Sequence, residues 1–285
     1  MVKNSAAITE AVGRVGTLRI EYVRRDDKTV VARSHATTPW HFLPTIYLDD
    51  TGQAHTLLVN PSAGLVGGDR LSIHMNLGEG ASALVSTPSA NRVYRSLGEE
   101  SVQTAEIALG PGAVLEWLPE PTIPFRGARF RQSIHVQLAP GATVLLWDAI
   151  ASGRIARDER WAFARLDNEI AISTADGRSV IERYQVTPSQ EGVGLAEAWD
   201  YVASLFVISD SIEAATWARL RERIAERFES AGPAVLGGVS EPAAPGVVVK
   251  LLARSAPDLS ETLGWLWETV RAVLWNLPKP ALRRY

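Results

Sequence analysis

The sequence predicts a mainly β fold of stacked layers with a small α-helical part near the C-terminus, all within a single domain of residues 1–285. Three observations support this prediction. Alternating apolar and polar residues, typical of half-buried strands, recur through about residues 17–190. Three segments in that region share one plan, which indicates stacked repeating units. Two segments with helical apolar spacing follow, at about 210–230 and 258–277.

The composition excludes several classes of protein. The chain has no cysteine, which rules out disulfides, thiolate metal sites and a cysteine nucleophile. The formal net charge of −3 argues against a nucleic-acid partner. No apolar run reaches the ~18 residues of a membrane-spanning helix, and charged residues interrupt the N-terminal segment where a signal peptide would be apolar. We therefore expect a cytoplasmic protein that binds neither nucleic acid nor membrane.

The strand pattern is clearest in three segments. In LSIHMNL every second residue is apolar, and His74 falls on the polar side. FRQSIHVQL, residues 130–138, repeats the pattern with one glutamine in phase with its apolar residues and His135 opposite them. ATVLLW, residues 142–147, is continuously apolar and fits a strand buried on both faces. The five histidines form no HExxH motif and no close pair of ligands, so we predict no zinc hydrolase site.

The repeated plan appears in MNLGEGASALV, IALGPGAVLEW and VQLAPGATVLLW. Each segment has a leucine, two loop residues, a Gly-Ala pair and then an apolar run. The glycines are Gly80, Gly112 and Gly141, which are 32 and 29 residues apart, and a tight turn there would use the positive φ that glycine adopts without steric cost. Real repetition predicts stacked units with one shared core. The alternative is that turn chemistry simply recurs in a β protein.

Two helices are predicted after these strands. In DSIEAATWARLRERIAERFES, Trp217 lies on an apolar face, and Asp210 with Glu213 forms a possible N-cap and N3 pair. VVVKLLA, residues 247–253, reads as a short apolar strand before the second helix. That helix carries a sustained apolar stripe flanked by tryptophans, which indicates either a core face or a seam for a partner.

The stretch NPSAGLVGGDRL places Gly64, Gly67 and Gly68 within five positions. A Walker A loop would need a lysine and a hydroxyl after its glycines, and here Asp69 would repel a phosphate. A dinucleotide-binding loop would open a helix, whereas this stretch opens a strand. We therefore predict a tight turn between strands that sets Asp69 and its neighbour Arg70 in place.

Three carboxylates lie in or beside apolar strands: Glu116, Asp148 and Glu182. A carboxylate in such a place needs a partner, or it faces a polar channel or an interface. Carboxylates without thiolates would bind a divalent ion such as nickel weakly. A convergent pair with shifted pKa values would instead suit a hydrolase or lyase acting in a β cleft. The simplest partners are the nearby arginines, which include Arg126, Arg129, Arg131, Arg154 and Arg157.

Four segments, in sequence order, resemble the motifs of the urease accessory protein family UreD, also called UreH. They are NPSAGLVGGDRL, GASALVSTPSANRVYRS, AVLEWLPEPTIPFRGARF and ASGRIARDER, and the resemblance is strongest from about Asn60 to Glu182. Two positions depart from the family pattern. Ala63 stands where the family has the first glycine of a pair, and Arg92 stands where it often has lysine.

The resemblance implies a function without catalysis. Proteins of this family bind apo-urease, built from UreA, UreB and UreC, and with UreF and the GTPase UreG they help deliver nickel to its active site. The resemblance also implies β-helix-like stacked sheets with a small helical part, no tightly bound cofactor, and nickel held transiently. The family's internal path for nickel is polar and acidic, and matching by motif assigns it Asp69, Asp148 and Glu182 here. Trp217 and Trp265 are the candidates for the UreF-facing surface.

Overall fold

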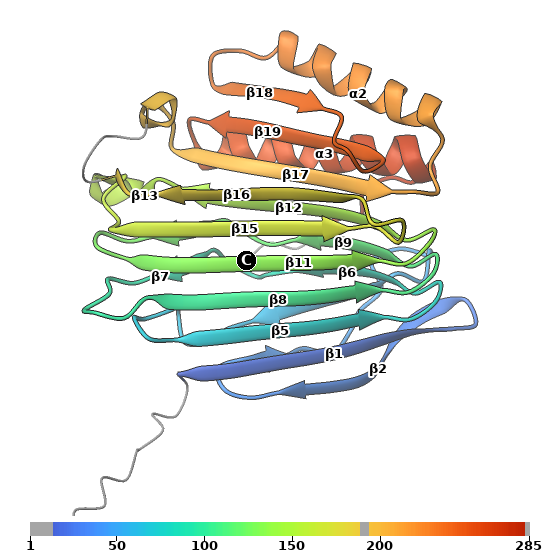
Figure 1. Cartoon of the computed structure of the whole chain (residues 1–285), viewed down its shortest axis with the longest axis horizontal. Helices are drawn as coiled ribbons and strands as arrows, with labels where there is room; N and C mark the ends of the chain where they lie inside the picture. The colour runs from blue at the N-terminus through green and yellow to red at the C-terminus, as the bar shows by residue number, and fades with distance from the viewer. Residues whose placement is uncertain (1–13, 189–193, 283–285) are drawn as a thin grey trace, which may run out of the picture.

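Two β-sheets stacked face to face form most of the protein (Figure 1). The computed structural model describes residues 14–188 and 194–282. The first sheet has seven strands in the order β16-β15-β11-β8-β5-β1-β2. In the ten-stranded second sheet, eight strands follow the order β18-β19-β17-β12-β9-β6-β4-β3, while β7 and β10 pair beside them. The predicted class, mainly β with stacked layers, is confirmed.

The bounds of the elements are as follows. The first sheet contains β1 (Val15–Arg25), β2 (Lys28–Ala36), β5 (Arg70–Leu77), β8 (Ser101–Leu109), β11 (Arg129–Leu138), β15 (Arg165–Ser173) and β16 (Ser179–Val186). The second contains β3 (His41–Phe42), β4 (Ala54–Val59), β6 (Ser82–Ser86), β7 (Asn91–Val93), β9 (Val114–Leu118), β10 (Thr122–Pro124), β12 (Thr143–Ala151), β17 (Tyr201–Ser209), β18 (Val235–Ser240) and β19 (Gly246–Ala253). The remaining elements are the small pair β13 (Gly153–Arg154) and β14 (Glu159–Arg160), the 3-10 turns η1 (Ile155–Arg157) and η2 (Gly194–Ala198), and the helices α2 (Ala214–Glu229) and α3 (Ala256–Trp275).

The chain repeats one course through the two sheets, so the stacked repetition is confirmed. A long strand of the first sheet ends in a tight turn, a strand of the second sheet follows, and the chain then returns. Strands β5, β8, β11 and β15 pair in parallel in one sheet, as β6, β9 and β12 do in the other. Gly80, Gly112 and Gly141 form the turns with φ angles of 62°, 63° and 75°. Glycine is favoured there because a side chain strains this left-handed backbone.

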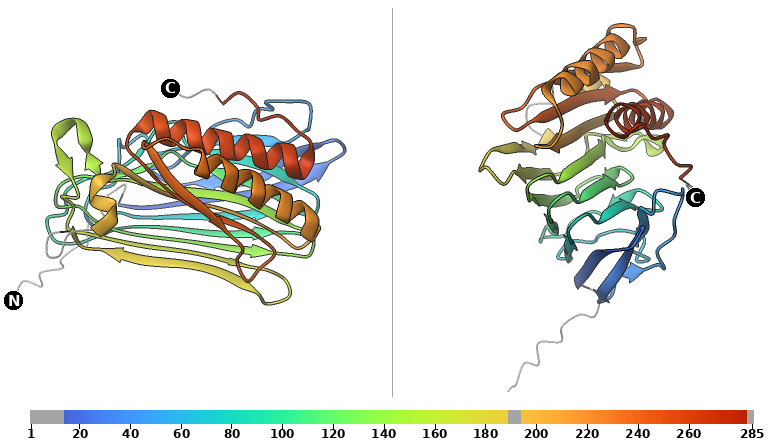
Figure 2. Two further views of the ribbon diagram at one scale, coloured as in Figure 1. Left: turned by 90° about the horizontal axis from the view of Figure 1, so that it is seen from above. Right: turned by 90° about the vertical axis from the view of Figure 1, so that its right-hand side faces the viewer.

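Apolar side chains fill two layers of core. Between the sheets, the alternating residues of β5, β8, β11 and β15 meet those of β6, β9 and β12. Figure 2 shows α2 and α3 on the other face of the second sheet, where Leu145 and Leu205 pack with Leu220 and Leu266. Strand β12 lies between these two layers, and all nine of its residues are buried, as the apolar run ATVLLW predicts.

The C-terminal part holds more sheet than the sequence predicts. Strands β17, β19 and β18 extend the second sheet by antiparallel pairing beyond the predicted β-rich region of about 17–190. Only β19 matches a predicted strand. Strand β17 is almost continuously buried and lacks alternation, and β18 contains a pair of glycines that reads as a loop. The two helices lie close to the predicted ranges of 210–230 and 258–277.

The predicted N-cap of the first helix is wrong. Helix α2 has Glu213 at its N-cap position, and no side chain caps it. Asp210 instead accepts a hydrogen bond of 2.8 Å from the backbone N–H of Gly141. The carboxylate therefore fastens the third glycine turn, because strand β17 brings it back to that edge of the sheet. Within the described ranges, no helix combines the length and the apolar character needed to cross a membrane.

Candidate functional site

A belt of polar side chains crosses the otherwise apolar space between the two sheets. Strand register places Gln103, Gln132, Asn168 and Tyr184 in one row on the inner face of the first sheet. It places Asp148, Ser204 and Lys250 in a second row on the inner face of the second sheet. Glu182 lies two residues before Tyr184 on the same face of β16. These eight residues are called the polar belt below.

The centre of the belt is held by Asp148. Gln132 Nε2 donates to Asp148 Oδ1 at 2.9 Å, and Asn168 Nδ2 donates to Asp148 Oδ2 at 3.1 Å. The two amides also bond each other at 2.9 Å, and Asn168 donates to the Tyr184 hydroxyl at 3.1 Å. Asp148 is only 6% exposed. Burial raises its pKa, and the two amide donors and the nearby Lys250 oppose that rise.

The far end of the belt contains an ion pair. Lys250 Nζ contacts the Glu182 carboxylate and donates to Ser204 Oγ at 2.9 Å. The Ser204 hydroxyl in turn donates to Glu182 Oε1 at 2.9 Å. The Lys250 side chain is 55% exposed. Its partial burial lowers the pKa of Lys250 to about 8, and the negative charge of Asp148 opposes this shift.

The belt lies between two separate cavities. The first has a volume of about 280 Å³ and is lined by Gln132 and Asp148, with Ala63 and Gly64 among its walls. The second has a volume of about 890 Å³, and Glu182, Tyr184, Ser204 and Lys250 are among the residues that line it. Asn168 bonds Asp148 on one side and Tyr184 on the other. Polar groups therefore continue from one cavity to the other.

Asp69 lies outside this belt. Its Oδ2 accepts a hydrogen bond of 2.9 Å from the backbone N–H of Val66, inside its own loop, and it lines neither cavity. Burial raises its pKa, while the Val66 bond and the charge of Arg14 oppose that rise. The loop that Asp69 fixes contains Gly64, which lines the first cavity. The structure thus brings Asp148 and Glu182 to one belt and leaves Asp69 outside it, buried in its own loop.

The glycines of this loop allow close packing against the next turn of the chain. A Cβ atom on Gly64 would lie 2.4 Å from the carbonyl oxygen of Arg92, and one on Gly67 would lie 2.8 Å from that of Glu99. Gly68 has a φ of 92°. Three of the positions thus require glycine for space or for backbone conformation.

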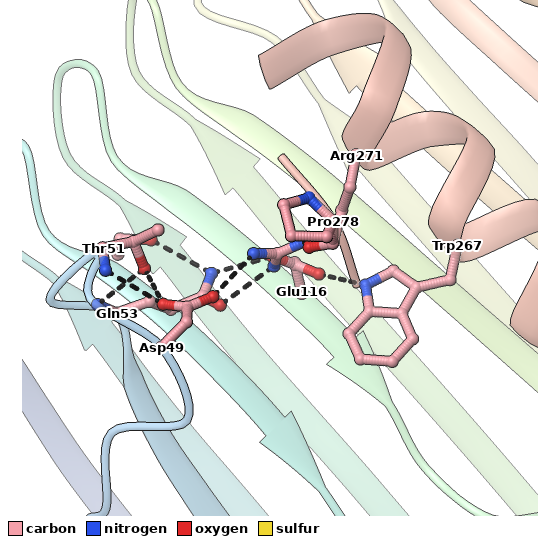
Figure 3. Close-up of polar contacts among 8 residues, drawn as sticks. Asp49, Thr51, Gln53, Glu116, Trp267, Arg271 and Pro278 are labelled. Carbon is pink, nitrogen blue, oxygen red and sulfur yellow. Dashed lines mark hydrogen bonds and ion pairs between the residues drawn. The ribbon is translucent and has the colours of Figure 1, made fainter. Parts of the chain in front are cut away.

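Glu116 takes part in a different cluster, at the junction of the second sheet and α3 (Figure 3). The predicted partners were nearby arginines, but its partner is Arg271, which donates to Glu116 and to Gln53 Oε1. Trp267 Nε1 donates to the other oxygen of Glu116, and Arg271 also donates to Asp49 at 3.1 Å. Burial raises the pKa of Glu116, and the Arg271 guanidinium opposes it most strongly. This carboxylate therefore ties the C-terminal helix to the sheet.

The two tryptophans proposed for partner binding differ in exposure. Trp217 is 4% exposed and packs in the core beneath α2, so its ring is not available to a partner. Trp265 is partly buried, and the guanidinium of Arg227 lies 5.8 Å from its ring centroid. Trp265 stays a candidate for a contact surface.

Most of the belt could not be found from the sequence. Two residues of the belt do leave a signal in the sequence. Gln132 falls on the apolar face of its alternating strand, and Lys250 interrupts an apolar run. Asn168, Tyr184 and Ser204 carry none, because their roles depend on strands that meet only in the folded protein. Across residues 14–188 and 194–282, no group of three or more His, Asp or Glu side chains is arranged to hold a metal ion.

Comparisons with known proteins agree on one family. A family model described as UreD urease accessory protein matches residues 14–285. The urease accessory protein UreD of Haloarcula marismortui is 30% identical over 279 residues, which cover 96% of this chain and 91% of that protein. The protein of the same name from Deinococcus radiodurans is 32% identical over 275 residues, 95% of each chain. The one from Nostoc sp. is 40% identical over 146 residues, about half of each chain.

Proposed function

This chain belongs to the UreD family of urease accessory proteins, and we propose that it is a scaffold and metallochaperone for urease. In this role it binds apo-urease (UreA, UreB and UreC) in the cytoplasm and, with UreF and the GTPase UreG, helps deliver nickel to the urease active site. The single observation that carries the proposal is the polar belt, which joins two cavities through the space between the sheets.

The chemistry of the belt suits a nickel ion in transit. Carboxylate, hydroxyl and amide oxygens bind borderline divalent cations, but without thiolate or clustered imidazole ligands they bind them weakly. Asp148 is 6% exposed and is held by two amide donors, so its carboxylate lies where water is largely excluded and attracts a cation more strongly than in water. Glu182 supplies a second carboxylate, which is paired with Lys250. Nickel is thus the cargo of this path, and we expect no tightly bound cofactor. Asp69 contributes by fixing the loop beside the first cavity.

A carboxylate-based hydrolase or lyase is the less supported alternative. Such an enzyme needs two carboxylates that face one substrate. Asp148 lines the first cavity and Glu182 lines the second, and each is already engaged by neighbouring donors. This placement favours a path over a cleft with two catalytic acids.

Complementation tests the proposal. A urease-producing strain that lacks this gene is supplied with the wild-type gene, Asp148→Asn or Glu182→Gln, and urease activity is measured in extracts. We expect no activation without the gene and strongly reduced activation with Asp148→Asn, which keeps the size of the side chain and removes its charge. Co-purification with UreF and urease should be unchanged. Full urease activity in the strain without the gene would end the proposal.

A further inference from the structure

Lys250 is the one cationic side chain of the eight-residue polar belt, and its ammonium is directed at the belt's own anions. It contacts the Glu182 carboxylate and donates to Ser204 Oγ at 2.9 Å. It shares the register row of Asp148 and Ser204, so all three side chains face the same space between the sheets. A positively charged side chain along a path for cations repels a passing cation, so the position of Lys250 needs an explanation.

The groups around Lys250 show that its ammonium and a divalent cation would compete for the Glu182 carboxylate. Without its ammonium, the Glu182 carboxylate would be left beside the Ser204 hydroxyl, in a cavity that Tyr184 also lines. A carboxylate with neighbouring hydroxyl oxygens offers hard oxygen ligands to a divalent cation. Asp148, in the same register row as Lys250, adds its negative charge from the first cavity. An ammonium on Glu182 neutralises that carboxylate and occupies one of its oxygens.

We propose that Lys250 is the resident counter-ion of the belt, which keeps Glu182 occupied until a divalent cation displaces it and thereby prevents the belt from trapping that cation. This inference rests on the proposed nickel path. At equal distance, the attraction between a carboxylate and a divalent ion is twice the attraction between a carboxylate and an ammonium. A divalent ion can therefore displace Lys250 from Glu182. A monovalent ion has no such advantage. When the divalent ion moves on, the ammonium returns to Glu182. The belt then releases its cargo instead of storing it.

The test measures binding of Ni²⁺ alone to the purified full-length chain by calorimetry and equilibrium dialysis. Lys250→Met removes the charge and keeps an unbranched apolar stem in a cavity with apolar walls. We expect Lys250→Met to bind Ni²⁺ at least roughly tenfold more tightly than the wild type, and Lys250→Arg to bind it like the wild type. In the double variant Lys250→Met/Glu182→Gln the gain should disappear, because the carboxylate that Lys250 occupies is gone. Circular dichroism checks that each variant is folded, and Lys250→Gln replaces Lys250→Met if the latter is not.

The outcomes separate this inference from the function it rests on. Equal Ni²⁺ affinity for the wild type and the charge-removing variant would overturn the role of Lys250. If Asp148→Asn still impairs urease activation in that case, the nickel path stands. Conversely, a tighter Ni²⁺ site in Lys250→Met together with normal activation by every belt variant would support the counter-ion and refute the path. A gain that survives Glu182→Gln would also count against the proposal, since the new site would then lie elsewhere.

Discussion

Removing Arg271 should destabilise the protein more than any surface substitution of the same kind. Arg271 is 1% exposed, and its partner Glu116 is 0% exposed. The substitution Arg271→Met leaves the Glu116 carboxylate buried, with only the Gln53 amide and the Trp267 indole as donors. Breaking a buried ion pair from one side costs about 3–5 kcal/mol, which is a large part of the ~5–15 kcal/mol that stabilises a typical domain.

The assay is urea unfolding followed by circular dichroism. Arg33→Met serves as the matched control, because Arg33 is 83% exposed and lies 3.8 Å from Glu21, a surface pair expected to contribute less than about 1 kcal/mol. The double variant Arg271→Met/Glu116→Gln should be more stable than Arg271→Met alone, since the unpaired charge is gone. The reasoning is refuted if Arg271→Met is no less stable than Arg33→Met.

The same variant has a predicted dependence on pH. Burial raises the pKa of Glu116 above its ordinary 4.5, and Arg271 opposes this rise in the wild type. In folded Arg271→Met, Glu116 therefore keeps its proton above pH 4.5, where the unfolded chain has lost it. The free energy of unfolding falls as pH rises from 4.5 to the higher pKa of Glu116 in the folded variant. The loss of stability relative to the wild type should be smaller near pH 5 than near pH 8. An equal loss at the two pH values would contradict this account of Glu116.

Three further predictions concern local features. Ala63 has a φ of 63°, so Ala63→Gly should stabilise the protein by about 0.5–1 kcal/mol in thermal unfolding, and a loss of stability would show that the loop does not hold that conformation. The Cβ of Gly112→Ala meets no atom within 4 Å, so this substitution should lower the free energy of unfolding by about 1 kcal/mol. Gly153→Ala would place its Cβ 2.0 Å from the carbonyl oxygen of Glu159 and should lower it clearly more. Equal losses in urea unfolding would argue against that close approach. Burial lowers the pKa of His55, so below pH 6.5 the unfolded chain takes up a proton that the folded chain resists, and stability falls as pH drops. His55→Gln should flatten the curve of stability against pH there, and an unchanged slope would assign the dependence to other groups.

The repeating part of the fold could be predicted because its signals are local. Alternation in β5 and β11 and the glycines at 80, 112 and 141 each reflect a strand or a turn that nearby residues specify. Strands β17 and β18 lacked such signals. One is buried on both faces and so does not alternate, and the other owes its pairing to β19 rather than to its own glycine-rich sequence.

The site was less predictable because it depends on distant partners. The sequence singles out Asp148, Glu182 and Glu116 as carboxylates in apolar surroundings, but it cannot distinguish their roles. Asp148 joins amides from two strands of the facing sheet, whereas Glu116 joins Arg271, 155 residues away. Which pairing forms is decided by the stacking of the sheets and the docking of α3.

We propose that nickel reaches urease along the polar belt and that its passage depends on the charge of Asp148. The most direct measurement is the nickel content of apo-urease after incubation with Ni²⁺, UreF, UreG, GTP and either the wild type or Asp148→Asn. Asp167→Asn is the control, since Asp167 accepts from Arg165 at 2.6 Å on the opposite face of the first sheet. We predict normal complex formation for both variants, with urease nickel strongly reduced by Asp148→Asn and unchanged by Asp167→Asn. Wild-type nickel content with Asp148→Asn would contradict the account.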